Sequence, residues 1–412
     1  MIIFENIVTS HAEKQSEEIK MAKKIGIILP LTLGLLSAFG PFITDFYLPA
    51  LPVMNDYFRT SPSMVQLSLT TSVIGLALGQ VFIGPLSDKY GRKRLLLGSL
   101  VLFCVATVFC IFSRDIWTFN AWRVFQGLGG AGGIVLSKSI STDMFTGKDL
   151  AKFMAILGAI NGVTPVLGPV VSGVILQFMT WQGIFVLVLM IAVILLVLSA
   201  LMKETLPVEK RERKSIAHSF QNLFKVFQNR RYVLSLITLA CCFFMFFAYI
   251  SASPFILQEA PYKLSPLMYS FCFGLNTIAI AVGAAMFPYF KKPQHCLLSG
   301  GVLMLFSALL VAACLTLQLP VWLLITAFTL LLFGFGLLQT PTTTIAMDAE
   351  RSNAGSAAAV LGAFSFLAGG LISPLVSIGE VAVTTSLIMV VIAVLILLMT
   401  WRLGKNISVS QP

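Results

Sequence analysis

Twelve long apolar segments follow one another along this chain, and they restrict its possible folds more than any other feature. Each is close to the ~20 residues that an α-helix needs to cross a hydrocarbon core of ~30 Å. Charged residues make up only 11% of the chain, whereas soluble domains carry about 25%. The sequence therefore predicts an all-α polytopic membrane protein. The predicted spans are 25–50, 63–86, 95–113, 117–138, 152–178, 183–202, 232–256, 266–290, 296–317, 321–345, 354–378 and 382–401.

The net charge of +11 would suit a nucleic-acid-binding protein, but the positions of the basic residues indicate membrane topology instead. With alternating loops and the N-terminus inside, 24 of the 28 Lys and Arg residues lie on the inner side. Three lie on the outer side (Arg59, Arg114 and Lys263), and one, Arg123, lies within a span. Basic loops remain in the cytoplasm. We expect a multi-pass protein of the bacterial cytoplasmic (inner) membrane, with both termini in the cytoplasm and no nucleic-acid partner.

The longest polar stretch inside the chain, 203–231, separates six spans from six. Two repeated bundles joined by a cytoplasmic linker are expected from such a layout. Apolar residues between 216 and 227 recur at helical spacing, which fits either an amphipathic helix on the inner leaflet or a solvated linker. Met1 and Met21 are both plausible starts. The predicted parts are an N-terminal tail (1–24), a first bundle (25–202), the linker (203–231), a second bundle (232–402) and a C-terminal tail (403–412).

Small residues recur at spacings of three and four on the second, fifth, eighth and eleventh spans. Such stripes let helix backbones approach closely, either in general membrane packing or at one particular interface. The constant step of three spans favours a pseudosymmetric fold in which these four helices join the two halves. The stripes consist of Ser68, Ser72, Gly75 and Gly79; Gly158, Gly162, Pro165, Pro169 and Gly173; Gly274, Thr277, Ala281 and Ala285; and Gly355, Ala359, Gly362 and Gly369.

Cysteine and histidine offer no metal site or disulfide framework in this pattern. The seven cysteines all fall within or beside spans without metal-type spacing, and they are expected to be small buried hydrophobes. The three histidines lie in loops or at a span edge. We expect no cofactor and no metal.

The loop between the second and third spans, GPLSDKYGRKR at 84–94, is the most specific string in the chain. Gly84 and Gly91 permit backbone geometry that other residues resist. Asp88 can accept hydrogen bonds from Arg92 or lie against a helix N-terminus. A run of basic residues alone would satisfy the topology rule, so the Gly, Asp and Gly at these offsets need another explanation.

This loop resembles the signature loop of the major facilitator superfamily, whose members have twelve helices in two pseudosymmetric six-helix bundles. The resemblance implies a conformational latch made by Gly84, Asp88, Gly91 and Arg92, in which Asp88 meets the N-terminus of the eleventh span near Ser352. The second-half copy of the loop, around 287–295, is badly degraded.

The fourth span carries Arg123, Gln126, Gly127 and Gly130 at spacings that place them on one helix face. This pattern resembles the R-x-x-Q-G motif of the same superfamily, which implies that Arg123 faces the central cavity and takes part in proton coupling. The alternative is a structural arginine held by carbonyl groups.

The fifth span, GAINGVTPVLGPVVSG at 158–173, resembles the motif of the superfamily's drug antiporters at Pro165, Gly168, Pro169 and Gly173. A helix rich in Gly and Pro can bend and seal against its partner. The same small face would also suit plain packing.

Asp45 is an acidic residue inside the first span, where insertion costs roughly 2.5–3.5 kcal/mol. Its context, TDFYLPALP, and the string ETL at 204–206 are similar to the bicyclomycin/chloramphenicol-resistance (Bcr/CflA) type of multidrug:proton antiporter. Burial disfavours the charged carboxylate, so we predict that Asp45 carries the coupling proton. The alternative is a simple cap near the outer interface. Some relatives have a second acid two turns earlier, where this chain has Ser37.

The resemblance also implies that the first, fourth, seventh and tenth spans line the cavity. The predicted function is alternating-access export of drugs or other small amphipathic molecules by a monomer that is driven by the proton gradient. Aromatic and Met side chains suit such ligands because they adapt and stack. The candidate substrate-binding residues are Phe42, Tyr47, Asn161, Phe244, Met245, Tyr249 and Gln339.

Other functions remain to be weighed. The same fold could export or import a specific metabolite such as a sugar, an amino-acid derivative or a siderophore. An enzyme would need clustered His, Asp or Glu residues, or a nucleophile beside a base, and the spans contain no such set. A channel would need a charged ring or a filter-like repeat, which is also missing from the sequence.

Overall fold

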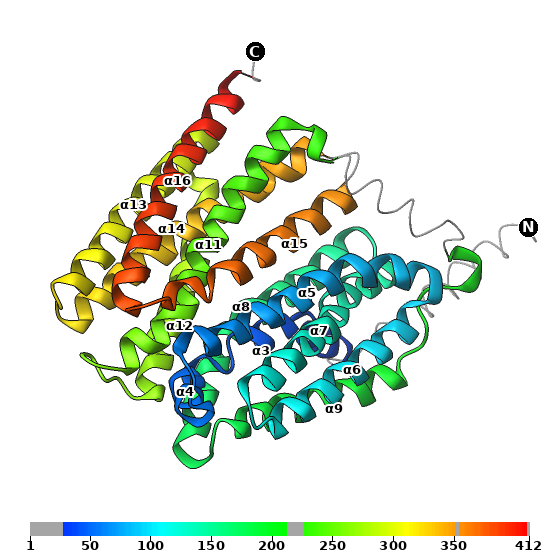
Figure 1. Ribbon diagram of the computed structural model, residues 1–412. Coiled ribbons are helices and arrows are strands. Elements are labelled where there is room, and N and C mark those ends of the chain that lie inside the picture. Colours follow the sequence, from blue (N-terminus) through cyan, green and yellow to red (C-terminus); the bar gives the residue numbers. More distant parts are fainter. Residues whose placement is uncertain (1–27, 212–225, 351–353, 410–412) are drawn as a thin grey trace, which may run out of the picture.

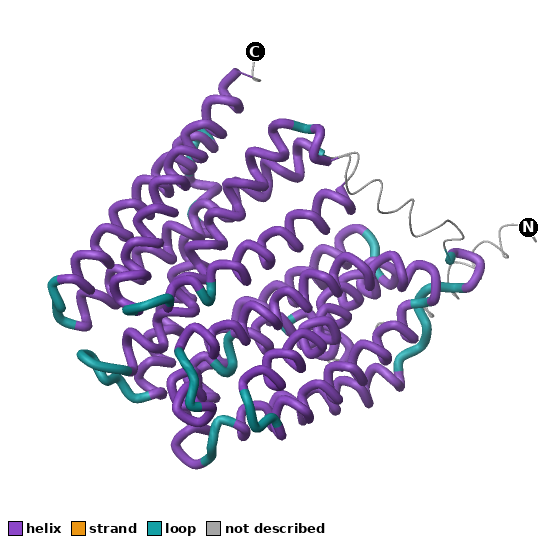
Figure 2. The backbone as a smooth tube through the Cα atoms, viewed as in Figure 1, coloured by secondary structure: helices purple, strands orange, loops and turns teal. Residues whose placement is uncertain are grey.

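The computed structural model describes residues 28–211, 226–350 and 354–409, and within these ranges it consists of helices and connecting loops (Figure 2). Helices run back and forth in two bundles that are inclined to each other (Figure 1). The first bundle contains α2 (Ile28–Ser37), α3 (Phe39–Thr44), η1 (Leu48–Ala50), α4 (Leu51–Phe58), α5 (Pro62–Tyr90), α6 (Arg92–Phe112), α7 (Ile116–Met144), α8 (Gly147–Phe178) and α9 (Gln182–Leu201).

The short helices η2 (Val208–Lys210) and η3 (Val226–Gln228) lie between the bundles in the chain. Residues 216–225 of the predicted amphipathic segment lie outside the described residues. The second bundle contains α11 (Arg230–Gln258), α12 (Pro266–Ala285), η4 (Phe287–Tyr289), α13 (Pro293–Thr316), α14 (Val321–Ala349), α15 (Ala354–Ile372), η6 (Leu375–Ser377) and α16 (Val381–Val409).

Ten of the described helices are long and apolar enough to cross a membrane, and the bent first segment makes an eleventh candidate. The remaining predicted span is α7, which does not meet that test of hydropathy. It nevertheless packs between α5 and α6 in the first bundle, and its polar residues Asn120, Arg123 and Gln126 are all buried. The described residues thus agree with the predicted layout of twelve spans.

Several helices extend beyond the apolar segments that predicted them. Helix α7 runs from Ile116 to Met144 and α14 from Val321 to Ala349, several residues past the predicted ends. A helix satisfies its own backbone hydrogen bonds, so polar turns can continue it outside an apolar layer. Asp115 caps the start of α7 by accepting a hydrogen bond from the Thr118 N–H at 2.8 Å. An apolar segment therefore indicates which part of a helix lies in the membrane core, but it does not indicate where the helix begins and ends.

The first span is longer than predicted and is broken. It reaches Phe58 rather than residue 50, and Ile28–Ser37 is bent by 52° from Phe39–Phe58. The helix also unwinds after Thr44, where Pro49 cannot donate the hydrogen bond that the Asp45 carbonyl would accept in an α-helix. That carbonyl accepts a 3.3 Å bond from the Leu48 N–H instead. Asp45 thus lies at a break inside the span, not at its outer end.

The two bundles meet through the four helices with small-residue stripes, as predicted. Helix α5 packs against α15, and α8 packs against α12. Gly173 of α8 lies so close to α12 that an added Cβ would be 3.0 Å from the Leu267 Cα. The stripe of α8 therefore contacts the other half at Gly173. The stripe of α5 does not follow the prediction, because a Cβ at Gly75 or Gly79 would meet Leu128 of α7 in the same half.

Side-chain hydrogen bonds between the halves lie near one end of the molecule. The Ser63 hydroxyl donates to the Pro374 carbonyl at 2.9 Å, the Gln66 amide to the Ser251 carbonyl at 2.7 Å, and the Thr70 hydroxyl to the Gly370 carbonyl. We call this the opposite end. The other end, which carries Ile28 and Val409, is the terminal end, and the ribbons of the halves diverge toward it (Figure 1). For the described residues, the halves are joined most firmly at the opposite end.

Candidate functional site

Asp45 is 5% exposed and lies at the break in the first span. Its carboxylate accepts a 2.7 Å hydrogen bond from the hydroxyl of the neighbouring Thr44. No ion pair involving Asp45 occurs among the residues that the structure describes. The acid is therefore buried with one neutral partner and no compensating cation.

Arg123 is 1% exposed, and its partners are neutral groups. Its guanidinium donates to the Ile43 carbonyl at 2.6 Å, to the Ser72 hydroxyl at 3.1 Å and to the Gln126 amide oxygen. The Ser68 carbonyl accepts a longer bond of 3.4 Å from Nε. The guanidinium carbon lies 4.4 Å from the centre of the Tyr47 ring, which adds a cation–π contact. These contacts match the alternative stated from the sequence, which is a structural arginine held by carbonyl groups.

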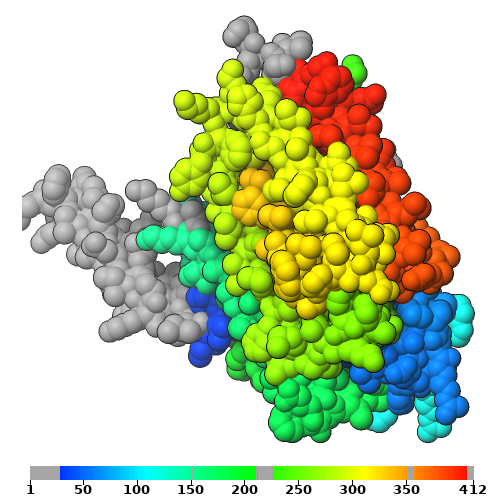
Figure 3. Space-filling model, turned by 90° about the vertical axis from the view of Figure 1, so that its left-hand side faces the viewer, coloured from blue at the N-terminus to red at the C-terminus, as the bar shows by residue number. Residues whose placement is uncertain are grey.

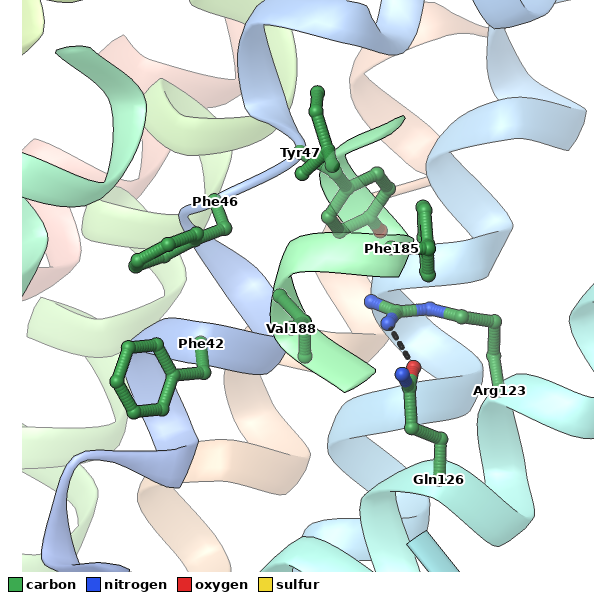
Figure 4. A pocket seen from close by; sticks show the side chains of 8 residues that line it. Phe42, Phe46, Tyr47, Arg123, Gln126, Phe185 and Val188 are labelled. Atoms are coloured by element: carbon green, nitrogen blue, oxygen red, sulfur yellow. Dashed lines mark hydrogen bonds between the residues drawn. The ribbon is translucent and has the colours of Figure 1, made fainter. Parts of the chain in front are cut away.

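A small pocket lies beside Arg123 (Figure 4). It has a volume of about 10 Å³, room for about one water molecule. Figure 4 shows the guanidinium directed between Gln126 and the rings of Tyr47 and Phe185. In this conformation the arginine is closed off from a drug-sized ligand. The pocket is lined by Phe42, Phe46, Tyr47, Arg123, Gln126, Ile184, Phe185 and Val188.

The structure brings two of the seven candidate substrate-binding residues together. Phe42 and Tyr47 line the same pocket as Arg123. Asn161 of α8 instead donates to the Ser37 hydroxyl in the first span. In the second half, Met245 is buried in the core, Phe244 is half-buried against it, and Gln339 of α14 is half-buried. Their role in binding stays a prediction.

Tyr249 belongs to a second polar cluster, which the sequence reasoning missed. Its hydroxyl accepts a 2.8 Å hydrogen bond from the Asn276 amide, and the Asn276 oxygen accepts a 2.7 Å bond from the Thr329 hydroxyl. Asp45 lies within electrostatic range of the Tyr249 and Tyr269 hydroxyls. An asparagine inside an apolar span was the signal that could have found this cluster.

The predicted latch loop is almost entirely helical, because residues 84–90 end α5 and Arg92 begins α6. Gly91 separates α5 from α6 with φ of +98°, a conformation that favours glycine. The prediction for Gly84 is wrong, because Gly84 lies inside α5 with ordinary helical geometry.

The charged side chains of the latch loop form a cluster within the first half. Arg92 makes ion pairs with Asp88 at 2.6 Å and with Asp143 at 3.0 Å, so Asp88 uses the first of its two predicted partners. Its predicted contact near Ser352 lies outside the described residues.

Glu204, just after α9, completes this cluster. Its carboxylate accepts hydrogen bonds from the backbone N–H groups of Arg92 at 2.9 Å and Lys93 at 3.3 Å, at the start of α6. A Cβ at Gly91 would lie 2.5 Å from this carboxylate. The ETL string thus has a local structural role that the sequence reasoning missed.

The antiporter-type helix α8 touches the broken first span directly. A Cβ at Gly168 would lie 2.5 Å from two carbon atoms of the Phe46 ring, next to Asp45. Pro165 and Pro169 lie within the helix, and Gly173 faces α12 of the other half. This helix therefore links the surroundings of Asp45 to the contact between the halves.

Comparison with known proteins decides the family. The Major Facilitator Superfamily profile matches residues 33–374. The chain belongs to this superfamily. It is a multi-pass membrane transporter and not an enzyme.

Similar proteins and structures agree with that assignment. The chain is 36% identical over 376 residues to the uncharacterized MFS-type transporter YdgK of Bacillus subtilis (strain 168), covering 90% of this chain and 93% of that protein. It is 32% identical over 172 residues to a bicyclomycin resistance protein homolog of Haemophilus influenzae, covering 42% and 43%. It is 27% identical over 216 residues to the multidrug resistance protein MdtL of Escherichia coli O139:H28, covering 52% and 54%.

Solved structures share the fold at low sequence identity. The xylose transporter XylE from E. coli, in a partially occluded inward open conformation, has a TM-score of 0.70 at 15% identity, covering 90% of this chain and 97% of that one. The nucleoside transporter NupG has a TM-score of 0.72 at 12% identity, covering 92% and 99%. At these identities the likeness concerns the fold alone.

Proposed function

We propose that this transporter exports drugs or other small amphipathic molecules from the bacterial cytoplasm in exchange for protons. It works as a monomer in the cytoplasmic membrane, with the terminal end in the cytoplasm. The 24 to 3 distribution of basic residues supports this orientation. The names of the bicyclomycin-resistance and multidrug-resistance relatives support the substrate class.

The observation that carries the proposal is the state of Asp45. A carboxylate that is 5% exposed and has no cationic partner in the described part of the chain is costly when charged. The cost is relieved either by a proton or by the positive group of a bound substrate. Because both would neutralise the same carboxylate, proton binding and cation binding at Asp45 are antagonistic, as an antiporter requires.

Arg123 contributes to transport by holding neighbouring spans in place, not by forming an ion pair. Its bonds to the Ile43 carbonyl and to Ser72 join the first, second and fourth spans just before the break that holds Asp45. The guanidinium thereby keeps the break in place and adds positive charge to the cavity wall. Neutral drugs can use its donors once the pocket beside it widens.

The contact between the halves supplies the conformational change. This conformation is closed at the opposite end by bonds from Ser63, Gln66 and Thr70. Rocking of one bundle against the other about the midplane would break these bonds and close the terminal end. In the reverse conformation, the Asp88 loop would latch the terminal end.

Transport by purified protein in liposomes tests the proposal. An imposed pH gradient, acidic on the side of the opposite end, should drive ethidium, a cationic amphipathic dye, toward that side. Asp45→Asn should abolish this gradient-driven movement because an amide binds neither a proton nor a cation. Asp115→Asn is the matched control, since Asp115 is an exposed helix cap and Asn also caps well.

Two outcomes would overturn the proposal. Wild-type ethidium transport by Asp45→Asn would remove this acid from the coupling. A protein that moves sugars or amino-acid derivatives under the same gradient, but neither ethidium nor chloramphenicol, would be a metabolite transporter.

A further inference from the structure

A cavity of about 300 Å³ opens between the start of α13 and the end of α16, at the terminal end of the second bundle. These two segments adjoin at the top of Figure 3, where the yellow-green and red surfaces meet. Two lysines and a histidine lie among the eight described residues that line it, and none of the eight is acidic. The lining residues are Lys292, Gln294, His295, Leu298, Thr400, Trp401, Gly404 and Lys405.

The corresponding place in the first bundle is filled by the protein's own carboxylate. Helix α9 packs against α6 there, and Glu204, which follows α9, accepts the backbone N–H groups at the start of α6. Helix α16 packs against α13 in the same way, but its end brings Trp401 and Lys405 to the cavity. Lys292, the N-cap of α13, makes no capping side-chain bond. The first bundle thus has the Glu204 carboxylate at the start of α6, and the second bundle has a cationic cavity at the start of α13.

We propose that this cavity binds the headgroup of an anionic phospholipid, with the phosphate between Lys292 and Lys405. Cationic pockets between membrane helices on the cytoplasmic side suit such headgroups. The side-chain oxygen of Gln294 is buried and has no hydrogen-bond partner, so a headgroup hydroxyl could donate to it. Phosphatidylglycerol has both the charge and the hydroxyls.

An apolar track beside the cavity favours a lipid over a free phosphate. Leu298, Val302 and Phe306 follow one another at intervals of four residues on α13, and they are 44%, 52% and 57% exposed. Residues at this spacing share one helix face. Trp401, 49% exposed at the rim, is of the type that anchors at membrane interfaces, and the Lys405 ammonium lies 3.7 Å from the centre of its ring. The headgroup would sit in the cavity while an acyl chain follows this track.

This arrangement also gives the degraded second-half loop a role. The segment around 287–295 has lost the acid and glycines of the latch loop but keeps a Lys pair, Lys291 and Lys292. A pair of lysines would be expected from topology alone. The absence of acids among the eight described lining residues and the adjoining apolar track are separate observations, and together they point to a lipid.

Lipid binding by the purified full-length protein in detergent tests the proposal. Native mass spectrometry should show phosphatidylglycerol retained in preference to phosphatidylcholine. The double substitution Lys292→Gln with Lys405→Gln should weaken the tightest site by about 30-fold, roughly fivefold for each basic side chain. The matched control is Arg94→Gln with Lys203→Gln, which removes two exposed charges from the terminal end of the first bundle.

Further measurements distinguish binding of a phospholipid from binding of a soluble phosphate compound. Soluble glycerol phosphate should not displace the retained lipid, and displacement at equal concentration would assign the site to a free phosphate compound. Phe306→Gln should weaken phosphatidylglycerol binding without creating glycerol phosphate binding. Equal retention by the lysine variant and the control would overturn the proposal. Thermal unfolding without lipid confirms that both are folded.

Discussion

The two halves of this transporter contain the same polar arrangement with different chemistry. In the first half, the Tyr47 hydroxyl bonds to Ser68 at 2.9 Å, and Arg123 of the fourth span reaches the Ser68 carbonyl. In the second half, the Tyr249 hydroxyl bonds to Asn276, and Thr329 of the tenth span reaches the same asparagine. In each half, a tyrosine of the first helix bonds to a residue of the second helix, and a residue of the fourth helix bonds to that same residue. The residue of the fourth helix is charged in the first half (Arg123) and neutral in the second (Thr329).

The two halves of a repeated fold can therefore take different roles. Hydrogen bonds from charged groups contribute about 1.5–3 kcal/mol, and those between neutral groups about 0.5–1.5 kcal/mol. The cluster of Arg123 should therefore hold its three spans more firmly than the cluster of Asn276 holds its own. We interpret the first half as the half that handles the proton and the second as the adaptable wall of the cavity.

The largest expected effect comes from removing the charge of the first cluster. Arg123→Gln should reduce transport at least about tenfold, because it loses several bonds worth roughly 1.5–3 kcal/mol each. Asn276→Ala, its counterpart, should cost less than about tenfold. The measurement is the initial rate of ethidium transport in liposomes at matched protein content. Equal losses in the two variants would show that the charge itself is unimportant.

The substitution Arg123→Lys separates the effect of the positive charge from the effect of the guanidinium geometry. Arg123→Lys keeps the charge but not the planar fork that reaches Ile43, Ser72 and Gln126 together. If position is the role of the arginine, this variant should be nearly as defective as Arg123→Gln. Recovery of wild-type rates would assign the role to charge alone.

The next effect concerns the packing of α8 on the first span. Gly168→Ala places a methyl group against the Phe46 ring, and overpacking of this kind costs about 1–3 kcal/mol. We expect slower transport and a measurable proton leak in the absence of drug. Gly162→Ala on the same helix is the control, because a Cβ there meets no atom within 4 Å. Identical behaviour of the two variants would exclude this contact as part of the seal.

A smaller effect is expected at the opposite end, where the halves are tied by neutral bonds. Gln66→Leu combined with Thr70→Val removes two of them, each worth about 0.6 kcal/mol inside a membrane. The population open at that end should rise by several-fold. Reaction of a single introduced cysteine at Ser251, which is fully buried at this end in the closed conformation, with a membrane-impermeant maleimide, in a variant without the seven native cysteines, measures this opening. An unchanged reaction rate would mean that apolar packing alone closes the end.

The smallest effect depends on pH and involves one acid from each half. Partial burial, and after it the charge of Asp56 in the first half, raise the pKa of Glu259 above its usual 4.5. The charged form therefore destabilises this closed arrangement. The penalty is absent below pH about 4.5 and is fully developed once pH has risen above the raised pKa.

Glu259→Gln should thus slow the maleimide reaction at neutral pH and leave it unchanged in acid. The reaction rate measured across a pH series for both proteins checks this sign. A variant that opens more readily than the wild type at neutral pH would contradict it.

The class, the two-bundle layout and the helices that join the halves could be predicted from the order of residues alone. Long apolar segments have few structures open to them in a membrane, because every backbone polar group must be bonded internally. Small residues at helical spacing then mark where backbones can approach. Asp45 and Arg123 could be picked out for a similar reason, since charged groups within spans are costly and therefore rare.

The contacts of those residues became clear only from the packing of the helices. The structure placed Asp45 at a helix break without a cation, surrounded Arg123 with neutral acceptors, and showed Glu204 bonded to the start of α6. It also revealed the Asn276 cluster and the cationic cavity between α13 and α16. Such partners lie tens to hundreds of residues apart in the chain, and no local pattern encodes which of many polar groups will meet. Helix packing settles that choice, because buried polar groups take the partners that the neighbouring helices bring within reach.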